Sequence, residues 1–135
     1  MKNILSGPVN KIVFALWLIA IHSFVVGIFL IFLPSSQVHI FGFEEHYGNF
    51  FRAQGGVFHL VMSVVYLMAA IDIYKSHNLI TVSIIAKMIA TLFLLIYYFA
   101  VNNIWTVLFS GIADFLMGFI LIILYLNFKK IVARK

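Results

Sequence analysis

The chain contains no cysteine among its 135 residues. That absence excludes disulfides, thiolate nucleophiles, zinc–cysteine sites and iron–sulfur clusters, and with them thiol-dependent redox chemistry. Charge is also scarce, because only 10% of the residues are charged, where a soluble domain has about 25%. Four acidic and nine basic side chains are too few to cover the surface of a soluble domain. A soluble enzyme is therefore excluded, and lipid is the expected solvent.

Hydrophobic residues make up 64% of the sequence and gather into four long runs. Each run reaches the roughly 20 residues that span the hydrocarbon core of a bilayer. We predict an all-α fold, an integral membrane antiparallel four-helix bundle that forms a single domain over 1–135. Its helices are expected at about 11–33, 50–74, 79–101 and 104–128. The first run is longer than the apolar region of a secretory signal and no A-x-A site follows it, so we expect a retained helix.

The breaks between the runs differ in character. Pro34 ends the first helix because proline disfavours the α conformation at Leu33 before it. The connection over 34–49 is polar and aromatic together, which suits the headgroup interface. Asn102 and Asn103 alone separate the last two runs, so these helices are expected to form an antiparallel hairpin.

Basic residues predict the orientation of the bundle. Seven of them fall on the side that holds both termini, and that side has Lys2, Lys11, Lys75, Lys129, Lys130, Arg134 and Lys135. The other side has only Arg52. By the positive-inside rule both termini face the cytoplasm, in a multi-pass protein of the inner membrane. Because the bases lie at the ends of apolar runs rather than among aromatics in a patch, nucleic acid is not an expected partner.

Each predicted helix carries one ionisable side chain near its middle, namely His22, His59, Lys87 and Asp114. Such groups cost on the order of 2.5–3.5 kcal/mol each at the bilayer centre, so they usually face the interior of a bundle. Small or polar residues flank them at helical spacing: Ser23 and Gly27, Gly55 and Ser63, Ser83 and Thr91, and Gly111 and Gly118. We predict that the four stripes meet in one polar layer and that Lys87 pairs with Asp114. The alternative is that these residues only hydrogen-bond neighbouring helices and fix their packing.

The segment from Arg52 to Gly56 opens the second helix with two adjacent glycines. Each costs about 1 kcal/mol relative to alanine inside a helix, so a close backbone approach is expected there. One interpretation is tight helix packing. The other is an outward cavity lined by Arg52, Gln54 and His59, with Glu44 or Glu45 paired to Arg52. The two interpretations are compatible.

Metal, haem and enzyme interpretations have weaker support in the sequence. His22 and His59 lie at similar depth, as two axial haem ligands would, but no propionate partner is identified, so we predict no cofactor. The outer cluster of His39, Glu44, Glu45 and His46 lacks metal-ligand spacing, and we predict a solvated loop and no metal site. His59 and Asp114 offer an acid and a base, but only a pocket that contains both would support a reaction class, so no catalytic residue is assigned.

Two short motifs resemble a known group of proteins. Gly27, Phe32 and Pro34 end the first helix, and an Arg-x-x-Gly-Gly pattern opens the second at Arg52. This arrangement resembles the small four-helix bacterial inner-membrane proteins of the DoxX-like and BphX-like type. The resemblance implies an antiparallel four-helix inner-membrane protein, and some DoxX relatives are subunits of quinone-linked oxidoreductases.

The convergence of ionisable groups predicts a membrane-embedded binding or accessory protein. Its polar core, with candidate ligand-binding residues His22, Arg52, Gln54, His59, Lys87 and Asp114, is expected to receive a lipid-like or quinone-like molecule. A partner membrane subunit or a second copy in a homo-oligomer is the other expected partner, besides the lipid bilayer itself. The alternative function is a proton- or ion-conducting element in which His22, His59 and Asp114 form a relay.

Overall fold

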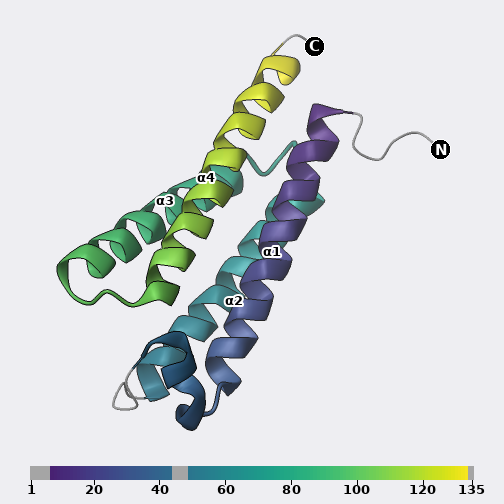
Figure 1. Cartoon of the computed structure of the whole chain (residues 1–135). Coiled ribbons are helices and arrows are strands. Elements are labelled where there is room, and N and C mark those ends of the chain that lie inside the picture. The colour runs from purple at the N-terminus through teal and green to yellow at the C-terminus, as the bar shows by residue number, and fades with distance from the viewer. Residues whose placement is uncertain (1–6, 44–48, 134–135) are drawn as a thin grey trace.

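The computed structural model describes residues 7–43 and 49–133, and this part of the chain is almost entirely helical. Four long helices follow one another, α1 (Pro8–Phe32), α2 (Asn49–Ile71), α3 (His77–Ala100) and α4 (Trp105–Val132). A short 3₁₀ helix, η1 (Ser35–Phe41), lies between α1 and α2 (Figure 1). The predicted all-α four-helix bundle is confirmed.

The helices run alternately up and down, so two ends of the bundle can be defined. The terminal end holds Pro8, the α2–α3 turn and Val132, and the distal end holds η1 and the α3–α4 turn (Figure 1). Helices α1 and α2 lie side by side over most of their length, whereas α3 leans away from them towards its C-terminal end (Figure 1). The bundle is therefore closer-packed at its terminal end than between α2 and α3 at its distal end.

Local sequence explains where α1 and η1 begin and end. Pro8 occupies the first turn of α1, where the missing N–H of proline costs nothing. The helix ends at Phe32, and Leu33 turns to ψ 122° ahead of Pro34, as the residue before a proline prefers. The sequence did not predict η1, which ends at Gly42 with φ 84°, a left-handed conformation that glycine adopts without strain.

Three predicted helix bounds were wrong by three or four residues. Helix α1 begins at Pro8 rather than near 11. Helix α2 stops at Ile71 rather than near 74, and a turn follows it in which the N–H groups of Lys75 and Ser76 both donate to the carbonyl of Asp72. Helix α4 continues to Val132 rather than stopping at 128, and Lys129 and Lys130 fall in its last turn. Positive side chains are favourable at that end of the helix dipole.

Glycine brings α1 and α2 into backbone contact. A Cβ atom added at Gly27 would lie 2.8 Å from the carbonyl oxygen of Gly56, and one added at Gly56 would lie 2.7 Å from that of Gly27. In lipid, where apolar burial gives no net drive, such close approach is a main source of helix association. The packing interpretation of the glycine pair therefore holds for Gly56.

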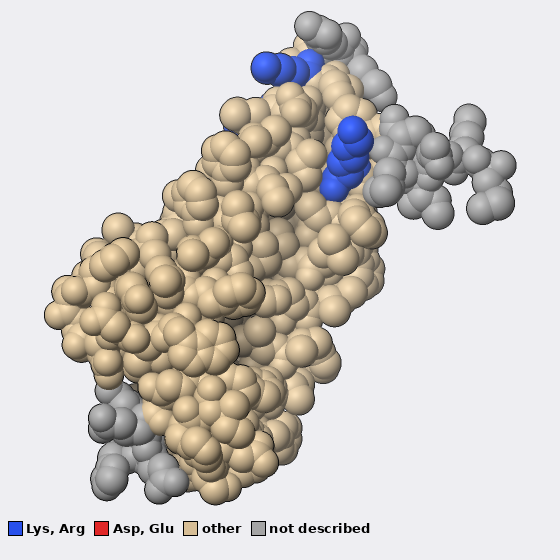
Figure 2. Space-filling view, viewed as in Figure 1, with Lys and Arg blue, Asp and Glu red and all other residues tan. Residues whose placement is uncertain are grey.

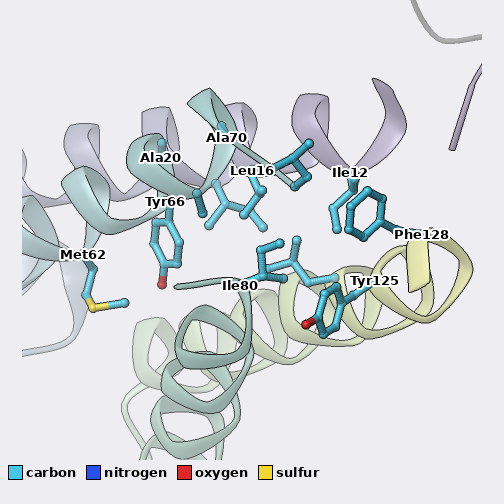
Figure 3. Close-up of a cluster of buried hydrophobic side chains, with 13 residues drawn as sticks. Ile12, Leu16, Ala20, Met62, Tyr66, Ala70, Ile80, Tyr125 and Phe128 are labelled. Carbon is cyan, nitrogen blue, oxygen red and sulfur yellow. The ribbon is translucent and has the colours of Figure 1, made fainter. Parts of the chain in front are cut away.

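The apolar core fills the terminal half of the bundle. Ile12 and Leu16 from α1 meet Tyr66 from α2, Ile80 from α3 and Phe128 from α4, and all five are at most 2% exposed (Figure 3). Every helix contributes to this cluster, so the four helices are tied together at this end.

The outer surface of the helices is apolar. Phe32, Phe51, Ile71 and Phe99 are each more than 70% exposed, and contiguous exposed apolar surface of this extent is not tolerated in water. All four long helices are long and apolar enough to cross a membrane. The chain is a multi-pass membrane protein by length and composition.

Charge is concentrated at one end of the described chain. Lys11, Lys75, Lys129 and Lys130 lie at the terminal end, and Arg52 lies near the distal end. The face shown in Figure 2 carries lysine at the terminal end and shows no acidic side chain among the described residues. Lys2, Arg134 and Lys135, which also entered the orientation argument, lie outside the described residues.

Candidate functional site

A cleft of about 330 Å³ lies where α3 leans away from α2. Its walls are mostly apolar, and Phe58 and Phe93 stand on opposite sides from α2 and α3. Five polar side chains also line it, and these are Ser23, His59, Tyr66, Lys87 and Asp114. Because each long helix supplies at least one of them, the cleft is a product of the whole bundle.

An ion pair between α3 and α4 lies in the cleft. Lys87 Nζ is 2.5 Å from Asp114 Oδ1, and the two side chains are only 3% and 10% exposed. The ammonium group also lies 5.7 Å from the centroid of the Tyr66 ring, a cation–π distance. The predicted pairing of Lys87 with Asp114 is confirmed.

A small residue on α4 allows this pair to form. A Cβ atom added at Gly118 would lie 3.2 Å from the Cβ of Lys87, so the backbone of α4 approaches α3 closely at this level. Gly111, Asp114 and Gly118 are all buried on α4, as their spacing predicted. The glycines thus bring the Asp114 carboxylate within reach of Lys87.

The buried face of α3 is polar, as predicted, but its two hydroxyl groups donate hydrogen bonds within the same helix. Ser83 and Thr91 lie one turn to either side of Lys87 and are buried with it. The Ser83 hydroxyl donates to the carbonyl of Leu79 at 2.7 Å, and the Thr91 hydroxyl donates to that of Lys87 at 2.8 Å. Of this stripe, only Lys87 presents a polar group to another helix through a hydrogen bond among the described residues.

Helix α2 places His59 and Tyr66 on one face, two turns apart. His59 is half-buried, and its ring packs edge-to-face on Phe58 at a centroid distance of 6.5 Å. Tyr66 is 2% exposed, and its side chain points from α2 towards α3 (Figure 3). The sequence did not identify Tyr66, although its spacing of seven residues from His59 placed it on the same face.

The contribution of α1 differs from the prediction. His22 is exposed and does not line the cleft, whereas its neighbour Ser23 is fully buried and does. Within residues 7–43 and 49–133, nothing donates a hydrogen bond to the Ser23 hydroxyl or accepts one from it. The polar layer therefore includes Ser23 in place of His22. The buried residues of α1 at this level recur every three or four positions, at Leu16, Ala20, Ser23 and Gly27. Ser23 belongs to this series and His22 does not.

Arg52 and Gln54 lie away from the cleft. Gln54 is exposed, and Arg52 donates through Nη2 to Asn49 Oδ1 at 3.3 Å. The same oxygen accepts a hydrogen bond from the Ser35 hydroxyl at 2.7 Å, so Arg52 helps to hold η1 on the start of α2. The proposed partners Glu44 and Glu45 lie outside the described residues. Of the three residues predicted to line the outward cavity, only His59 lines the cleft.

The described residues contain no group of three His, Asp or Glu side chains that could hold a metal ion. Of the two histidines considered as haem ligands, His59 lines the cleft and His22 does not. Of the outer cluster, His39 is exposed at the end of η1, and Glu44, Glu45 and His46 lie outside the described residues.

Comparison with family models, curated proteins and solved structures finds no match to this chain. The resemblance to DoxX-like proteins therefore stays a prediction. The candidate site rests on its own geometry.

Proposed function

We propose that this chain is a binding protein of the inner membrane, with both termini in the cytoplasm, whose cleft takes the head group of a membrane amphiphile. The ligand is lipid-like or quinone-like, with its polar head in the cleft and its tail in the bilayer. The observation that carries the proposal is the placement of five polar side chains in an apolar-walled cleft of about 330 Å³. Small-molecule sites have this size and this composition.

The depth of the cleft supports a ligand that comes from the membrane. Lys87 lies ten residues beyond the start of α3, and Asp114 lies nine beyond the start of α4. At 1.5 Å per residue, each is about 14–15 Å from the beginning of its helix. Since α3 and α4 start at opposite ends of the bundle, both side chains are near its middle. A molecule that reaches them must itself partition into lipid.

The mouth of the cleft faces outward between two aromatic side chains. Phe58 is 59% exposed and Phe93 is 63% exposed, so both rings lie at the surface that lipid would cover. An alkyl or prenyl tail fits between such rings, while the head lies against the polar groups further in. The cleft therefore has the order of chemistry that a single-tailed amphiphile requires.

Native mass spectrometry after gentle extraction tests the proposal. The wild-type chain is expected to retain a small lipid or quinone. Ala90→Phe adds a large apolar side chain to the α3 wall of the cleft and removes no polar group, and it should abolish the adduct. Ile89→Phe is the matched control, because Ile89 is 63% exposed on the lipid side of the same helix, and it should keep the adduct. A wild-type chain that never carries a lipid or quinone would overturn the proposal.

A protein partner would show in the same spectra. A second copy or another subunit adds a protein mass rather than a lipid mass, and it need not depend on Ala90. A protein adduct that Ala90→Phe removes would assign the cleft to a partner subunit instead of an amphiphile.

The proton-relay alternative has less support. His22 is exposed and outside the cleft, and Asp114 is held by Lys87. His59 and Asp114 do line one cleft, which is the condition for considering acid–base catalysis, but the ion pair occupies the carboxylate. Proteoliposomes are expected to hold a pH gradient equally well with the wild-type chain and with His59→Ala. A leak that His59→Ala removes would favour conduction.

A further inference from the structure

We infer that the cleft selects an uncharged head group that carries a hydroxyl or carbonyl oxygen, and that the Ser23 hydroxyl is its hydrogen-bonding partner. The inference rests on the proposed function, because it names the class of amphiphile that the cleft takes. Long-chain alcohols and monoacylglycerols belong to this class. Permanently charged detergents and lipids of the same tail length do not.

The charges in the cleft already balance each other. Lys87 Nζ contacts Asp114 Oδ1 at 2.5 Å and lies over the Tyr66 ring. Both members of the pair line the cleft, so a charged head group would approach the charge that repels it together with the one that attracts it. A charged head group that paired with one member would leave the other uncompensated, which is strongly unfavourable at membrane depth. An uncharged head group meets neither cost.

The Ser23 hydroxyl is a buried polar group without a partner. Its residue is 0% exposed, and no described residue hydrogen-bonds to its Oγ. The buried hydroxyls of Ser83 and Thr91 on α3 instead donate to carbonyls one turn back in their own helix. Ser23 is among the residues that line the cleft, so a head group that enters the cleft lies beside this side chain. Buried polar groups are rarely left unmatched, so a ligand hydroxyl or carbonyl is the chemistry that fits there.

Two further groups can complete the recognition of such a head. The His59 ring and the Tyr66 side chain both line the cleft from α2, and His59 is the more exposed of the two. A phenol both donates and accepts, and a neutral imidazole offers one donor and one acceptor. Together with Ser23 they match a head with several oxygens, without any net charge from the protein.

Photolabelling of the full-length chain in phosphatidylcholine nanodiscs tests the inference. Three probes share one alkyl tail with a diazirine and differ in the head: a glycerol ester, a sulfonate and a trimethylammonium group. We expect saturable labelling of α2 and α3 by the glycerol probe, and labelling by both charged probes about 100-fold weaker, because the cost of one uncompensated charge at the bilayer centre corresponds to a factor of this size.

The outcomes separate the two proposals. A charged probe that labels the cleft as well as the glycerol probe overturns the inference and leaves the amphiphile site standing. Labelling that no probe saturates overturns the proposed function as well. An unlabelled monoacylglycerol and a prenylated quinone, used as competitors, distinguish a head that donates and accepts from one that only accepts.

Ser23→Ala tests the assigned partner. The variant should weaken binding of the glycerol probe about three- to tenfold, the loss of one hydrogen bond. Its thermal stability in detergent should not fall, because the lost hydroxyl has no protein partner. Ser63→Ala is the matched control, since Ser63 is 3% exposed on α2 but lines a separate shallow groove. Equal probe binding by Ser23→Ala and the wild-type chain overturns the assignment.

Discussion

Lys87 shows how one lysine is held among apolar helices. Its ammonium group lies between the Asp114 carboxylate and the face of the Tyr66 ring, and the side chain is 3% exposed. Attraction within such a pair repays the loss of solvation only while both partners are present. The two residues are therefore energetically dependent on each other.

Removing one partner should be far more costly than removing both. Asp114→Asn is expected to lower the free energy of unfolding by about 3–5 kcal/mol, because it leaves Lys87 buried and uncompensated. The double variant Lys87→Met with Asp114→Leu should recover most of that loss. Unfolding by SDS titration in mixed micelles measures both.

The exposed pair at the α2–α3 turn serves as the control for this experiment. Lys75 Nζ lies 3.4 Å from Asp72 Oδ2, with side chains that are 87% and 46% exposed. Asp72→Asn should change stability by at most about 1 kcal/mol, as exposed pairs do. Equal losses for Asp114→Asn and Asp72→Asn would contradict the dependence of Lys87 on its partner.

At the scale of elements, two neighbouring glycines on α2 have different structural roles. A Cβ at Gly56 would meet the backbone and side chains of α1, whereas a Cβ at Gly55 meets nothing within 4 Å. Gly56 thus sets the contact between α1 and α2, and Gly55 borders the cleft. A single sequence pattern, two glycines in a row, therefore serves both packing and the candidate site.

Alanine substitution should separate these roles. Gly56→Ala is expected to destabilise the chain by about 1–3 kcal/mol, because the helices must move apart or distort. Gly55→Ala should be neutral or stabilising by up to about 1 kcal/mol, since alanine is the better helix former and meets no neighbour. The same SDS titration compares them, and equal destabilisation by the two variants would argue against the close contact at Gly56.

A single hydrogen bond joins the 3₁₀ helix to α4. The Thr106 hydroxyl donates to the carbonyl of Phe41 at 2.6 Å, over 65 residues of sequence. Thr106→Val keeps the shape and removes the donor, so hydrogen exchange over 35–42 should rise by about three- to tenfold, the value of one hydrogen bond.

Thr81 provides the comparison for that prediction. Its hydroxyl donates to the carbonyl of His77 within α3, at the opposite end of the bundle. Thr81→Val should leave exchange in η1 unchanged. Faster exchange over 35–42 in both variants would mean that general loosening, not the Thr106 contact, is responsible.

At the scale of the whole molecule, the bundle brings the start of α1, the end of α4 and most described basic residues to one end (Figures 1 and 2). The sequence predicts this arrangement because apolar runs lie in the bilayer and basic residues lie in the water beside it. The number of spans was predicted from the length of the apolar runs. The Lys87–Asp114 pair was predicted because a charged side chain in lipid needs a partner.

The sequence did not predict which residues of α1 face the interior of the bundle. Neighbouring residues of a helix differ by about 100° in direction, and α1 is apolar on every side, so hydropathy gives no preferred face for His22 or Ser23. Burial chose Ser23. The departure of α3 from α2, which makes the cleft, depends on side-chain packing between elements and has no local sequence signal. Tyr66 was missed because tyrosine in a membrane helix is expected at the interface rather than in the interior.

Labelling of single cysteines tests the orientation, and because the chain has no native cysteine, any label on the purified protein is on the introduced thiol. Gln37→Cys places a thiol on η1 at the distal end, and Lys75→Cys places one in the turn at the terminal end; both native side chains are exposed. In intact cells a membrane-impermeant maleimide should label the first variant and should label the second only after permeabilisation. The reverse pattern would place the termini outside the cytoplasm.

The apolar cluster seals the terminal half of the bundle, while the cleft opens between α2 and α3 in the distal half. In a bilayer this difference gives the two leaflets unequal access to the cleft. A single-tailed molecule in the distal leaflet reaches Phe58 and Phe93 by lateral diffusion, whereas one in the opposite leaflet must first flip across the membrane. For the amphiphile that we propose, occupancy of the cleft would follow the composition of one leaflet, and a change in lipid asymmetry would alter it even when the total amount of ligand stays constant.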